Sequence, residues 1–448
     1  MSDELLERID GAVIAAGEDG YDAAAIGHNL AAVPVAETVV VASSAADVLE
    51  AVRWAKASGK RVAVLATGHG PIPPPAELLI NTARIDDVSV DPATKTATIG
   101  AGARWKAVYP PAAEHGLAPI TGSSTNVGVV GYLLGGGMGP LARSHGMSSD
   151  YVTSFDVVTG DGELRTVTAE QDPELFWALR GGKAGLGIVT SVTIRLVELE
   201  TLYAGSLMFD TGEIEAALRG WVAWLNDDPD PRVTTSVAIA RMPPFEEIPE
   251  PLRGRHLLSL RFAFPGDSEE GERLAEPLRA LAPVYIDDLG EMKTTEMARI
   301  CNDPDDPGPS WISARLLDRV DDEWATSWLS FFGPEAEPPP FVGIETRQLG
   351  GALAEDVAEG SAAGGRSAGY SIGMVGVDPS LFEAELPAKA AEVYEAIAPY
   401  LSEDGNANFV AAPKTRADFE AAFSPEARKK LAEIRANYDP DGVIALWD

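Results

Sequence analysis

Cysteine is almost absent from this chain, which has a single one, Cys301, among 448 residues. A lone cysteine excludes an internal disulfide and leaves no thiol pair for a structural metal site. Long apolar runs are also missing, and none approaches the ~18 residues that a membrane-spanning helix needs. The segment from Met1 to Arg8 is acidic and lacks the basic-then-apolar order of a secretory signal, so we expect a cytoplasmic location.

Basic side chains are scarce. The 35 lysines and arginines face 69 acidic residues, which gives a formal net charge of −34. Such a surface repels polyanions, so we expect neither nucleic acid nor anionic membranes as partners. Apolar residues make up 45% and charged residues 23%, a globular composition. The length favours more than one domain, and the oligomeric state stays open.

The pattern of apolar residues predicts mixed secondary structure. Residues 36–43 are β-branched and favour a strand, Ser44 and Asp47 resemble a helix-capping pair, and helical spacing continues to Gly59. A second strand follows at 61–66. Further strands, hairpins and helices are predicted at 78–80, 88–90, 97–99, 154–168, 174–180, 188–196, 257–264 and 382–401. A strand, a helix and a strand followed by hairpins indicate an α+β fold.

Several segments resemble known functional motifs but lack a residue that the chemistry of the motif needs. Residues 369–373 match the nucleophile elbow of serine hydrolases, but all five histidines precede Ser371, whereas that chemistry needs one after it. The run 135–140 lacks the third glycine of a nicotinamide-dinucleotide fingerprint, because Pro140 stands there. No histidine pair has the spacing of a zinc protease, so we expect no metal. The loop 302–308 begins like a calcium loop, but Pro307 replaces a ligand and a turn is favoured.

Three glycine-rich segments remain. The first, 66–70, ends a predicted strand, and its small residues leave backbone amides free for a pyrophosphate. The second begins at Thr121 and continues to Met147. The third spans 175–182 and 185–190. Any one of them alone would be ordinary turn sequence, whereas their order and spacing together are specific.

In that order and spacing the segments resemble the FAD-linked oxidases of the berberine-bridge-enzyme-like group, in the vanillyl-alcohol-oxidase and p-cresol-methylhydroxylase superfamily. The resemblance covers residues 36–196 and returns at 408–409 and 430–440, with a weaker echo at 350–352. It implies a two-domain flavoprotein: an FAD-binding domain at 1–200, a substrate domain at 201–404 with an antiparallel sheet covered by helices, and a segment at 405–448 that completes the first domain.

The resemblance also implies which residues hold the cofactor. His69 occupies the place of the histidine that attaches covalently to the 8α-methyl group of the flavin, and neutral imidazole is a suitable nucleophile. The residues expected along FAD are Ala66, Thr67, Gly68, His69, Gly70, Thr121, Gly122, Ser123, Ser124, Asn126, Val127, Gly128, Gly131, Gly135, Gly136, Gly137, Met138, Gly139, His145, Gly146, Gly187, Ile188, Val189 and Asn408.

Two positions depart from the family pattern. Many relatives carry a second link through a cysteine where this chain has Ser124, so we expect one bond only. The tyrosine that usually reaches the active site from the C-terminal segment is replaced by Asn406, which puts the usual phenolate base in doubt. Because removing a hydride from an alcohol carbon is easier as the hydroxyl proton leaves, a base must then come from the second domain.

Two candidates for that base lie on predicted strands. Glu345 and Arg347 share one face of a strand, and Tyr370 lies on another. Charged neighbours on one face are more often a solvated or paired surface, and that alternative stays open.

The expected function is oxidation of an alcohol, a sugar or a hydroxylated natural-product intermediate with molecular oxygen as acceptor, or an oxidative ring closure. The alternatives are a flavin dehydrogenase that avoids oxygen and a catalytically inactive FAD-binding protein.

Overall fold

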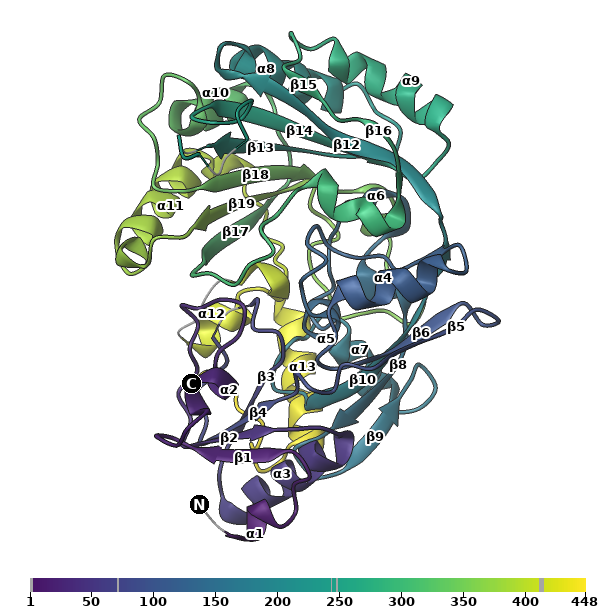
Figure 1. Cartoon of the computed structure of the whole chain (residues 1–448), viewed down its shortest axis with the longest axis vertical. Coiled ribbons are helices and arrows are strands. Elements are labelled where there is room, and N and C mark those ends of the chain that lie inside the picture. The colour runs from purple at the N-terminus through teal and green to yellow at the C-terminus, as the bar shows by residue number, and fades with distance from the viewer. Residues whose placement is uncertain (1–2, 71, 243, 247–248, 411–414) are drawn as a thin grey trace.

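The computed structural model describes residues 3–70, 72–242, 244–246, 249–410 and 415–448. Figure 1 shows an upper part built from strands β12 to β19 and a lower part that holds the N-terminal strands together with the C-terminal helices. The predicted α+β class is confirmed. Among the described residues, no helix combines the length and the apolar character needed to cross a bilayer.

A four-stranded sheet forms the base of the lower part. Its order is β1 (Ala12–Ala15), β2 (Thr38–Val41), β4 (Leu78–Asn81) and β3 (Val62–Leu65), of which the last three are parallel. Parallel neighbours need a crossover, which α3 (Ala45–Ser58) supplies between β2 and β3. Ser44 accepts a hydrogen bond from the Asp47 backbone, and left-handed Gly59 ends the helix, so both predicted helix boundaries are confirmed. The short helices α1 (Asp3–Leu6) and α2 (Tyr21–Ala25) pack nearby.

A five-stranded antiparallel sheet lies beside the first. Its order is β5 (Val88–Asp91), β6 (Thr96–Gly100), β10 (Ile188–Arg195), β8 (Val152–Val158) and β9 (Leu164–Val167). The predicted hairpin at 154–168 is the β8–β9 pair, which begins two residues earlier. Trp105 of α4 (Trp105–Ala113) and Phe176 of α7 (Pro173–Leu179) are buried in the core of this region. A short pair, β7 (Leu117–Ala118) with β11 (Val197–Glu198), adjoins it.

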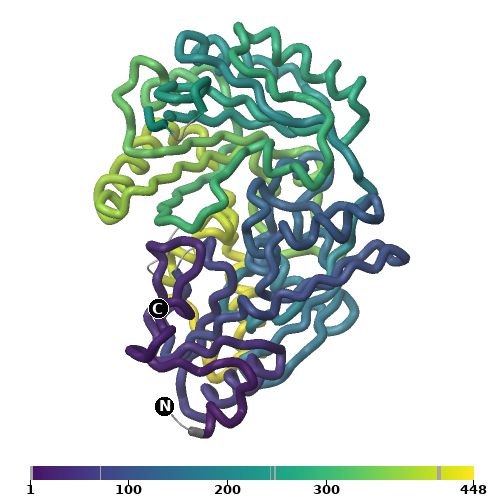
Figure 2. Tube along the Cα trace, in the orientation of Figure 1, coloured from purple at the N-terminus to yellow at the C-terminus, as the bar shows by residue number. Residues whose placement is uncertain are grey.

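The end of the chain returns to the lower part. Leu431 of α13 (Pro425–Tyr438) belongs to the same buried core as Trp105, as does Phe419 of α12 (Arg416–Glu420). The Val62 backbone then pairs with Val443 and Ala445 on either side of Ile444, at 2.8 Å each. Figure 2 shows the yellow C-terminal segment among purple and blue N-terminal ones. We keep the division into 1–200, 201–404 and 405–448 as a proposal.

An eight-stranded antiparallel sheet forms the upper part. Strands β15, β12, β14, β13, β18, β19 and β17 follow one another, and β16 also pairs with β12. Trp221, Trp324 and Trp328 are buried where helices cover one face. The elements are β12 (Thr201–Asp210), α8 (Ile214–Leu225), β13 (Thr234–Arg241), β14 (His256–Phe264), α9 (Ser268–Arg279), β15 (Ile286–Asp287), β16 (Gly290–Lys293), β17 (Trp311–Leu317), α10 (Asp322–Phe332), β18 (Gly343–Gln348), β19 (Tyr370–Gly376) and α11 (Glu385–Ala396).

The helix predicted over 382–401 is shorter than expected. α11 begins at Glu385 and ends at Ala396, and a 3₁₀ turn follows at Ala398–Tyr400. Proline is tolerated in the first helical turn, where Pro387 lies, but not in the interior. Pro399 therefore cannot continue the α-helical hydrogen bonding.

The two faces of the upper sheet differ. Ile344 of β18 and Ile372 of β19 pack into the core under the helices. Because side chains alternate along a strand, Glu345 and Arg347 point to the other face. There the Arg347 Nη1 donates to the backbone oxygen of Met138 at 2.9 Å, so this face meets the glycine-rich loops of the lower part.

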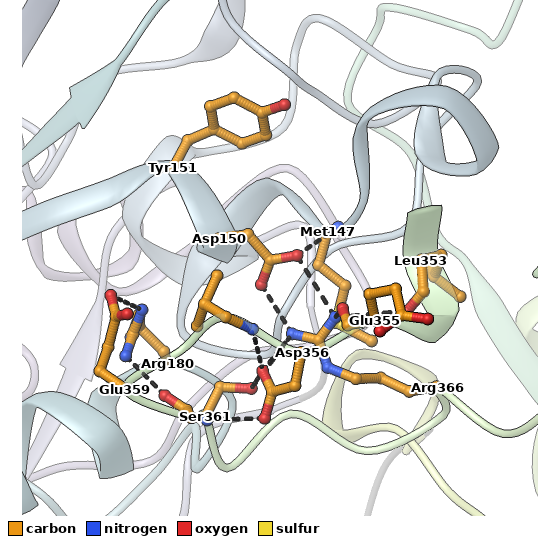
Figure 3. A network of polar contacts seen from close by, with 12 residues as sticks. Met147, Asp150, Tyr151, Arg180, Leu353, Glu355, Asp356, Glu359, Ser361 and Arg366 are labelled. Carbon is orange, nitrogen blue, oxygen red and sulfur yellow. Dashed lines mark hydrogen bonds and ion pairs between the residues drawn. The ribbon is translucent and has the colours of Figure 1, made fainter. Parts of the chain in front are cut away.

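A polar network ties the two parts together (Figure 3). Arg366 pairs with Asp150 at 2.6 Å and with Asp356 at 2.9 Å, and it also donates to the backbone oxygen of Glu355. The Asp150 carboxylate in turn accepts from the Met147 backbone at 2.9 Å. The network fixes the segment around residues 353–366 against the turn that follows the second glycine-rich loop.

Candidate functional site

The first glycine-rich loop, 66–70, follows β3 and is held by a neighbouring segment of the chain. The backbone N–H of His28 donates to the Thr67 oxygen, and that of Asn29 to the Gly68 oxygen, both at 2.9 Å. A Cβ atom on Gly27 would lie 2.5 Å from the Cα of Gly68, so neither glycine can be replaced without moving the backbone. Gly68 also has a φ of 65°, which favours glycine.

His69 projects from this loop as a neutral imidazole. Its ring stacks on that of His28, with centroids 3.6 Å apart and planes 14° from parallel. Burial, with a smaller effect of the neighbouring His28 and Arg104, lowers the pKa of His69 to about 3. The Nε2 atom is buried and has no hydrogen-bond partner in the described part of the chain.

The second glycine-rich loop contacts the first. A Cβ atom on Gly128 would lie 2.7 Å from the Thr67 Oγ1, so this glycine permits the close approach. Asn126 precedes α5 (Val129–Leu133), and its backbone oxygen accepts from the Arg104 guanidinium at 2.5 Å. The Asn126 Oδ1 is buried without a partner, whereas its Nδ2 donates to the Asp305 oxygen at 2.7 Å.

The glycines between Gly135 and Gly139 are packed too closely to their neighbours to be replaced by residues with side chains. A Cβ atom on Gly139 would lie 1.7 Å from the Thr121 oxygen, and one on Gly137 would lie 2.4 Å from the Tyr132 ring. Gly135 meets the side chain of Asn408, whose Nδ2 donates to the Tyr132 oxygen at 2.9 Å. The structure thus brings the C-terminal segment to the second loop. The remaining predicted residues of these two loops are Ala66, Gly122, Ser123, Ser124, Val127, Gly131, Gly136 and Met138.

The other predicted cofactor residues lie in two places: beside the 3₁₀ turn Gly351–Ala354 of the upper part, and at the start of β10 in the lower part. His145, at the end of α6 (Ala142–His145), is hydrogen-bonded to Ser144, and Gly146 adjoins Asp150. Gly187, Ile188 and Val189 lie at the start of β10, beside β8. These contacts do not join the five residues to His69, and their place along a cofactor stays a prediction.

The two loops have the features of a cofactor site. The buried atoms His69 Nε2, Asn126 Oδ1 and Ser149 Oγ lack partners within the described residues. Buried polar groups are normally paired, so unpaired ones indicate a missing partner. A Cβ atom on Gly70 or Gly131 would meet nothing within 4 Å, so the loops are open at these points. The residues therefore fit a cofactor with polar groups along its length.

Sequence reasoning missed three residues of this region. His28 stacks on His69, Arg104 donates to Asn126, and Lys183 donates to the Asn408 Oδ1 at 2.7 Å. Burial lowers the pKa of Lys183 to about 8. A signal existed for one of them, because the pair Gly27-His28 repeats the pair Gly68-His69, and the two glycines meet.

The predicted base Glu345 is a paired carboxylate. Both of its oxygens accept from the Arg347 Nη2 at 3.0 Å, and one accepts from Arg261 at 2.9 Å. Burial raises its pKa, but the two guanidinium groups and a hydrogen bond from Ser236 outweigh burial and lower the pKa to about 2. The structure therefore shows that Glu345 is paired, and its role as a base stays a proposal.

The other two catalytic candidates do not join Glu345. Tyr370 lies directly opposite Gln348 on the neighbouring strand, so it shares the helix-covered face with Ile372 and Ile344. Asn406 is buried beside Gly136, and its amide donates to the Gly364 oxygen and accepts from the Asn408 backbone. Tyr370 therefore lies on the face opposite to that of Glu345, and Asn406 holds the backbones of neighbouring loops.

Two glycine substitutions, one in the closely packed second loop and one in the open part of the first loop, should have different effects on stability. Gly139→Ala should abolish folding or FAD binding, because the new Cβ would overlap the Thr121 oxygen. Gly70→Ala has open space and should leave the melting temperature unchanged, while FAD affinity falls if the cofactor passes this loop. Thermal unfolding with and without FAD measures both. A Gly139→Ala protein with normal stability and flavin content would contradict the close packing.

Comparison with known proteins is consistent with this arrangement. A family model described as an FAD binding domain matches residues 36–168. (R)-6-hydroxynicotine oxidase of Paenarthrobacter nicotinovorans is 32% identical over 194 residues, which cover 43% of this chain and 42% of that protein. The chain spans less than half the length of the curated relatives that it matches first.

Two solved structures share the whole fold. BBE-like 1 of Physcomitrella patens matches with a TM-score of 0.82 and 18% identity, over 99% of this chain and 97% of that one. Carbohydrate oxidase of Microdochium nivale, solved with a substrate analogue, matches with a TM-score of 0.80 and 17% identity, over 98% and 97%. At these identities the likeness shows the fold alone.

The family match confirms the predicted cofactor, FAD. Residues 36–168 match an FAD binding domain, and the whole chain shares the fold of BBE-like 1 of Physcomitrella patens.

Proposed function

We propose that this protein is an FAD-dependent oxidase that acts on an alcohol, a sugar or a hydroxylated natural product. In this proposal FAD is attached by one covalent bond through His69, and molecular oxygen is the electron acceptor. The observation that carries the proposal is the half-buried His69, whose buried Nε2 has no partner among the described residues, at the meeting point of the two glycine-rich loops. The carbohydrate oxidase and the hydroxynicotine oxidase above support the substrate classes.

In this proposal the lower part of the protein binds the cofactor and the upper part binds the substrate. The loops around Gly68, Asn126 and Gly135 would hold the cofactor through backbone groups, since their packing admits little else. When bound, FAD accepts a hydride from the substrate carbon and passes the electrons on to oxygen. The open face of the upper sheet, with Arg347 and Glu345, meets the second loop through Met138 and would bind and orient the substrate.

The face of the upper sheet that carries Glu345 and Arg347 has more positive than negative side chains. Two guanidinium groups, Arg261 and Arg347, surround one carboxylate, Glu345, so their summed charge is positive. Small or short residues, Gly373 and Ser371, lie directly opposite Glu345 and Arg347 on β19 and leave room for a ligand. A hydroxylated substrate would find donors in the arginines and an acceptor in the carboxylate.

Anaerobic reduction of the bound flavin tests the proposal. Purified protein is mixed without oxygen with primary and secondary alcohols, mono- and oligosaccharides, and hydroxylated aromatic compounds, and flavin bleaching is followed by stopped flow. At least one class should bleach the flavin, and admitting oxygen should restore the colour with release of hydrogen peroxide. Bleaching that reverses only with an artificial dye would indicate a dehydrogenase. A flavin that light reduces but no substrate class does would contradict an enzymatic role.

A further inference from the structure

His28 is a second imidazole at the proposed attachment point, and its backbone is fixed there. The Gly27 and Gly68 backbones touch, and the hydrogen bonds of His28 and Asn29 hold the two segments in register. On the other side Asn29 forms a short bridge to Gly308, and its side chain exchanges hydrogen bonds with Ser310 at 2.9 and 3.0 Å. The His28 backbone is therefore held by the fold from both sides, and the ring stacks on His69.

Burial, together with the His28 ring, lowers the pKa of His69. At 3.6 Å between centroids, each imidazole removes water from one face of the other. A proton on either ring would face the second ring and the nearby cations Arg104 and Lys106, and for His28 the carboxylates of Asp305 and Asp306 offset this only in part. Burial is the largest cause of the lowered pKa of both histidines. His69 consequently keeps a free lone pair at neutral pH.

We propose that His28 is a positioning residue for flavin attachment: its ring, stacked on His69, orients the His69 imidazole and shields it from water so that it can bond to FAD. This inference rests on the proposed attachment through His69. In that step a ring nitrogen of His69 forms a bond to the 8α carbon. One hydrogen leaves the methyl group and one leaves the imidazole, and both are taken up by the flavin, which is thereby reduced by two electrons. Oxygen then reoxidises the flavin and becomes hydrogen peroxide.

Stacking and proton transfer by His28 make different predictions for two substitutions. His28→Ala removes the ring, so it should both misplace His69 and admit water. His28→Phe keeps an aromatic ring of similar size but has no ring nitrogen. If the stack is what matters, phenylalanine should retain most of the attachment rate and alanine should not. His115→Ala, at an exposed histidine, is the matched control.

The experiment uses full-length chain produced under riboflavin limitation and then mixed with FAD. Covalent incorporation is followed by flavin fluorescence in denaturing gels, and non-covalent affinity by fluorescence quenching on FAD addition. We expect His28→Ala to slow incorporation by roughly 10²-fold, the size of a misplacement effect, with FAD affinity nearly unchanged. His28→Phe should stay within about tenfold of wild type by the same reasoning. NMR titration should show the pKa of His69 rising toward its ordinary value in His28→Ala.

Three results would overturn the inference. His28→Ala could incorporate FAD at the wild-type rate, His28→Phe could be as slow as His28→Ala, or the pKa of His69 could be the same in all variants. A wild-type protein that binds FAD but never attaches it would instead refute the attachment itself, and with it the role of His28, while leaving the oxidase proposal to the reduction experiment.

Discussion

His69→Ala should yield protein whose flavin is lost entirely on acid precipitation, whereas the wild-type pellet should stay yellow. The physical reason is that the buried His69 Nε2 has no hydrogen-bond partner among the described residues, whereas the Nδ1 of the neighbouring His28 lies 3.5 Å from the Asn126 Nδ2. Ser124, where relatives have a second linking residue, carries a hydroxyl that accepts from the Asn126 backbone at 3.3 Å and cannot form a thioether. Absorbance of pellet and supernatant, with mass spectrometry of a proteolytic digest, measures the result.

The proteolytic digest shows how many covalent bonds join the flavin to the protein. Flavin mass should appear only on the peptide that contains His69, and His115→Ala, a control at an exposed histidine, should keep full attachment. Flavin on a peptide from residues 117–139 would show that a second bond exists. A colourless wild-type pellet, with all FAD in the supernatant, would refute covalent attachment and leave a non-covalent FAD site.

Glu345→Gln should slow reduction of the flavin by substrate by roughly 10²–10⁴-fold, the range typical for loss of a general base. The substitution removes the proposed proton acceptor on the face of the upper sheet that meets the glycine-rich loops, and it leaves Arg261 and Arg347 without their shared carboxylate. Tyr370→Phe is the matched control, since the structure places Tyr370 on the helix-covered face. Asn406→Ala should cost less than Glu345→Gln because its amide only positions the backbone of neighbouring loops.

Anaerobic stopped flow, with equal flavin content in all variants, measures these rates. Wild-type reduction by Glu345→Gln together with slow reduction by Tyr370→Phe would reverse the two assignments. Equal rates in all three variants would place the base on another residue.

The same carboxylate should give a pH-dependent term in stability. Its pKa falls from 4.5 to about 2 on folding, so the ionised form is favoured in the native state. Its contribution is fully present above pH 4.5, amounts to about 3 kcal/mol, and is lost as the pH falls toward 2. The difference in unfolding free energy between wild type and Glu345→Gln should therefore shrink on acidification. A difference that is constant from pH 6 to pH 3 would contradict the ion pairing.

The glycine-rich loops could be located from the sequence because their constraints are local, and their contact with FAD stays a proposal. A loop that must approach another backbone closely needs glycine, and runs such as Gly135 to Gly139 are visible without a structure. The helix boundaries at Ser44 and Gly59 were predictable for the same reason, since capping involves neighbours in sequence. The end of the helix predicted at 382–401 was wrong because helical spacing outweighed Pro399 in the prediction.

The sequence could not predict which face of the sheet Tyr370 lies on. Alternation shows that successive side chains point to opposite faces, but it does not show which of the two faces the helices cover. That side is set by packing between distant segments, here Trp221, Trp324 and Ile372. Pairing of Glu345 with Arg261, a residue 84 positions away, likewise depends on strand order. The stack of His28 on His69 required two loops to meet across the lower part.

Taken alone, the sequence determined the cofactor class and the position of the proposed attachment, since both depend on residue types that few other structures require in that order. The tertiary structure decided which charged groups pair, which of the candidate bases face the loops, and that His69 is shielded by a second imidazole. The physical reason is that burial and neighbouring charges change the pKa values of Glu345 and His69. These neighbours are far apart in the sequence, and only folding brings them together.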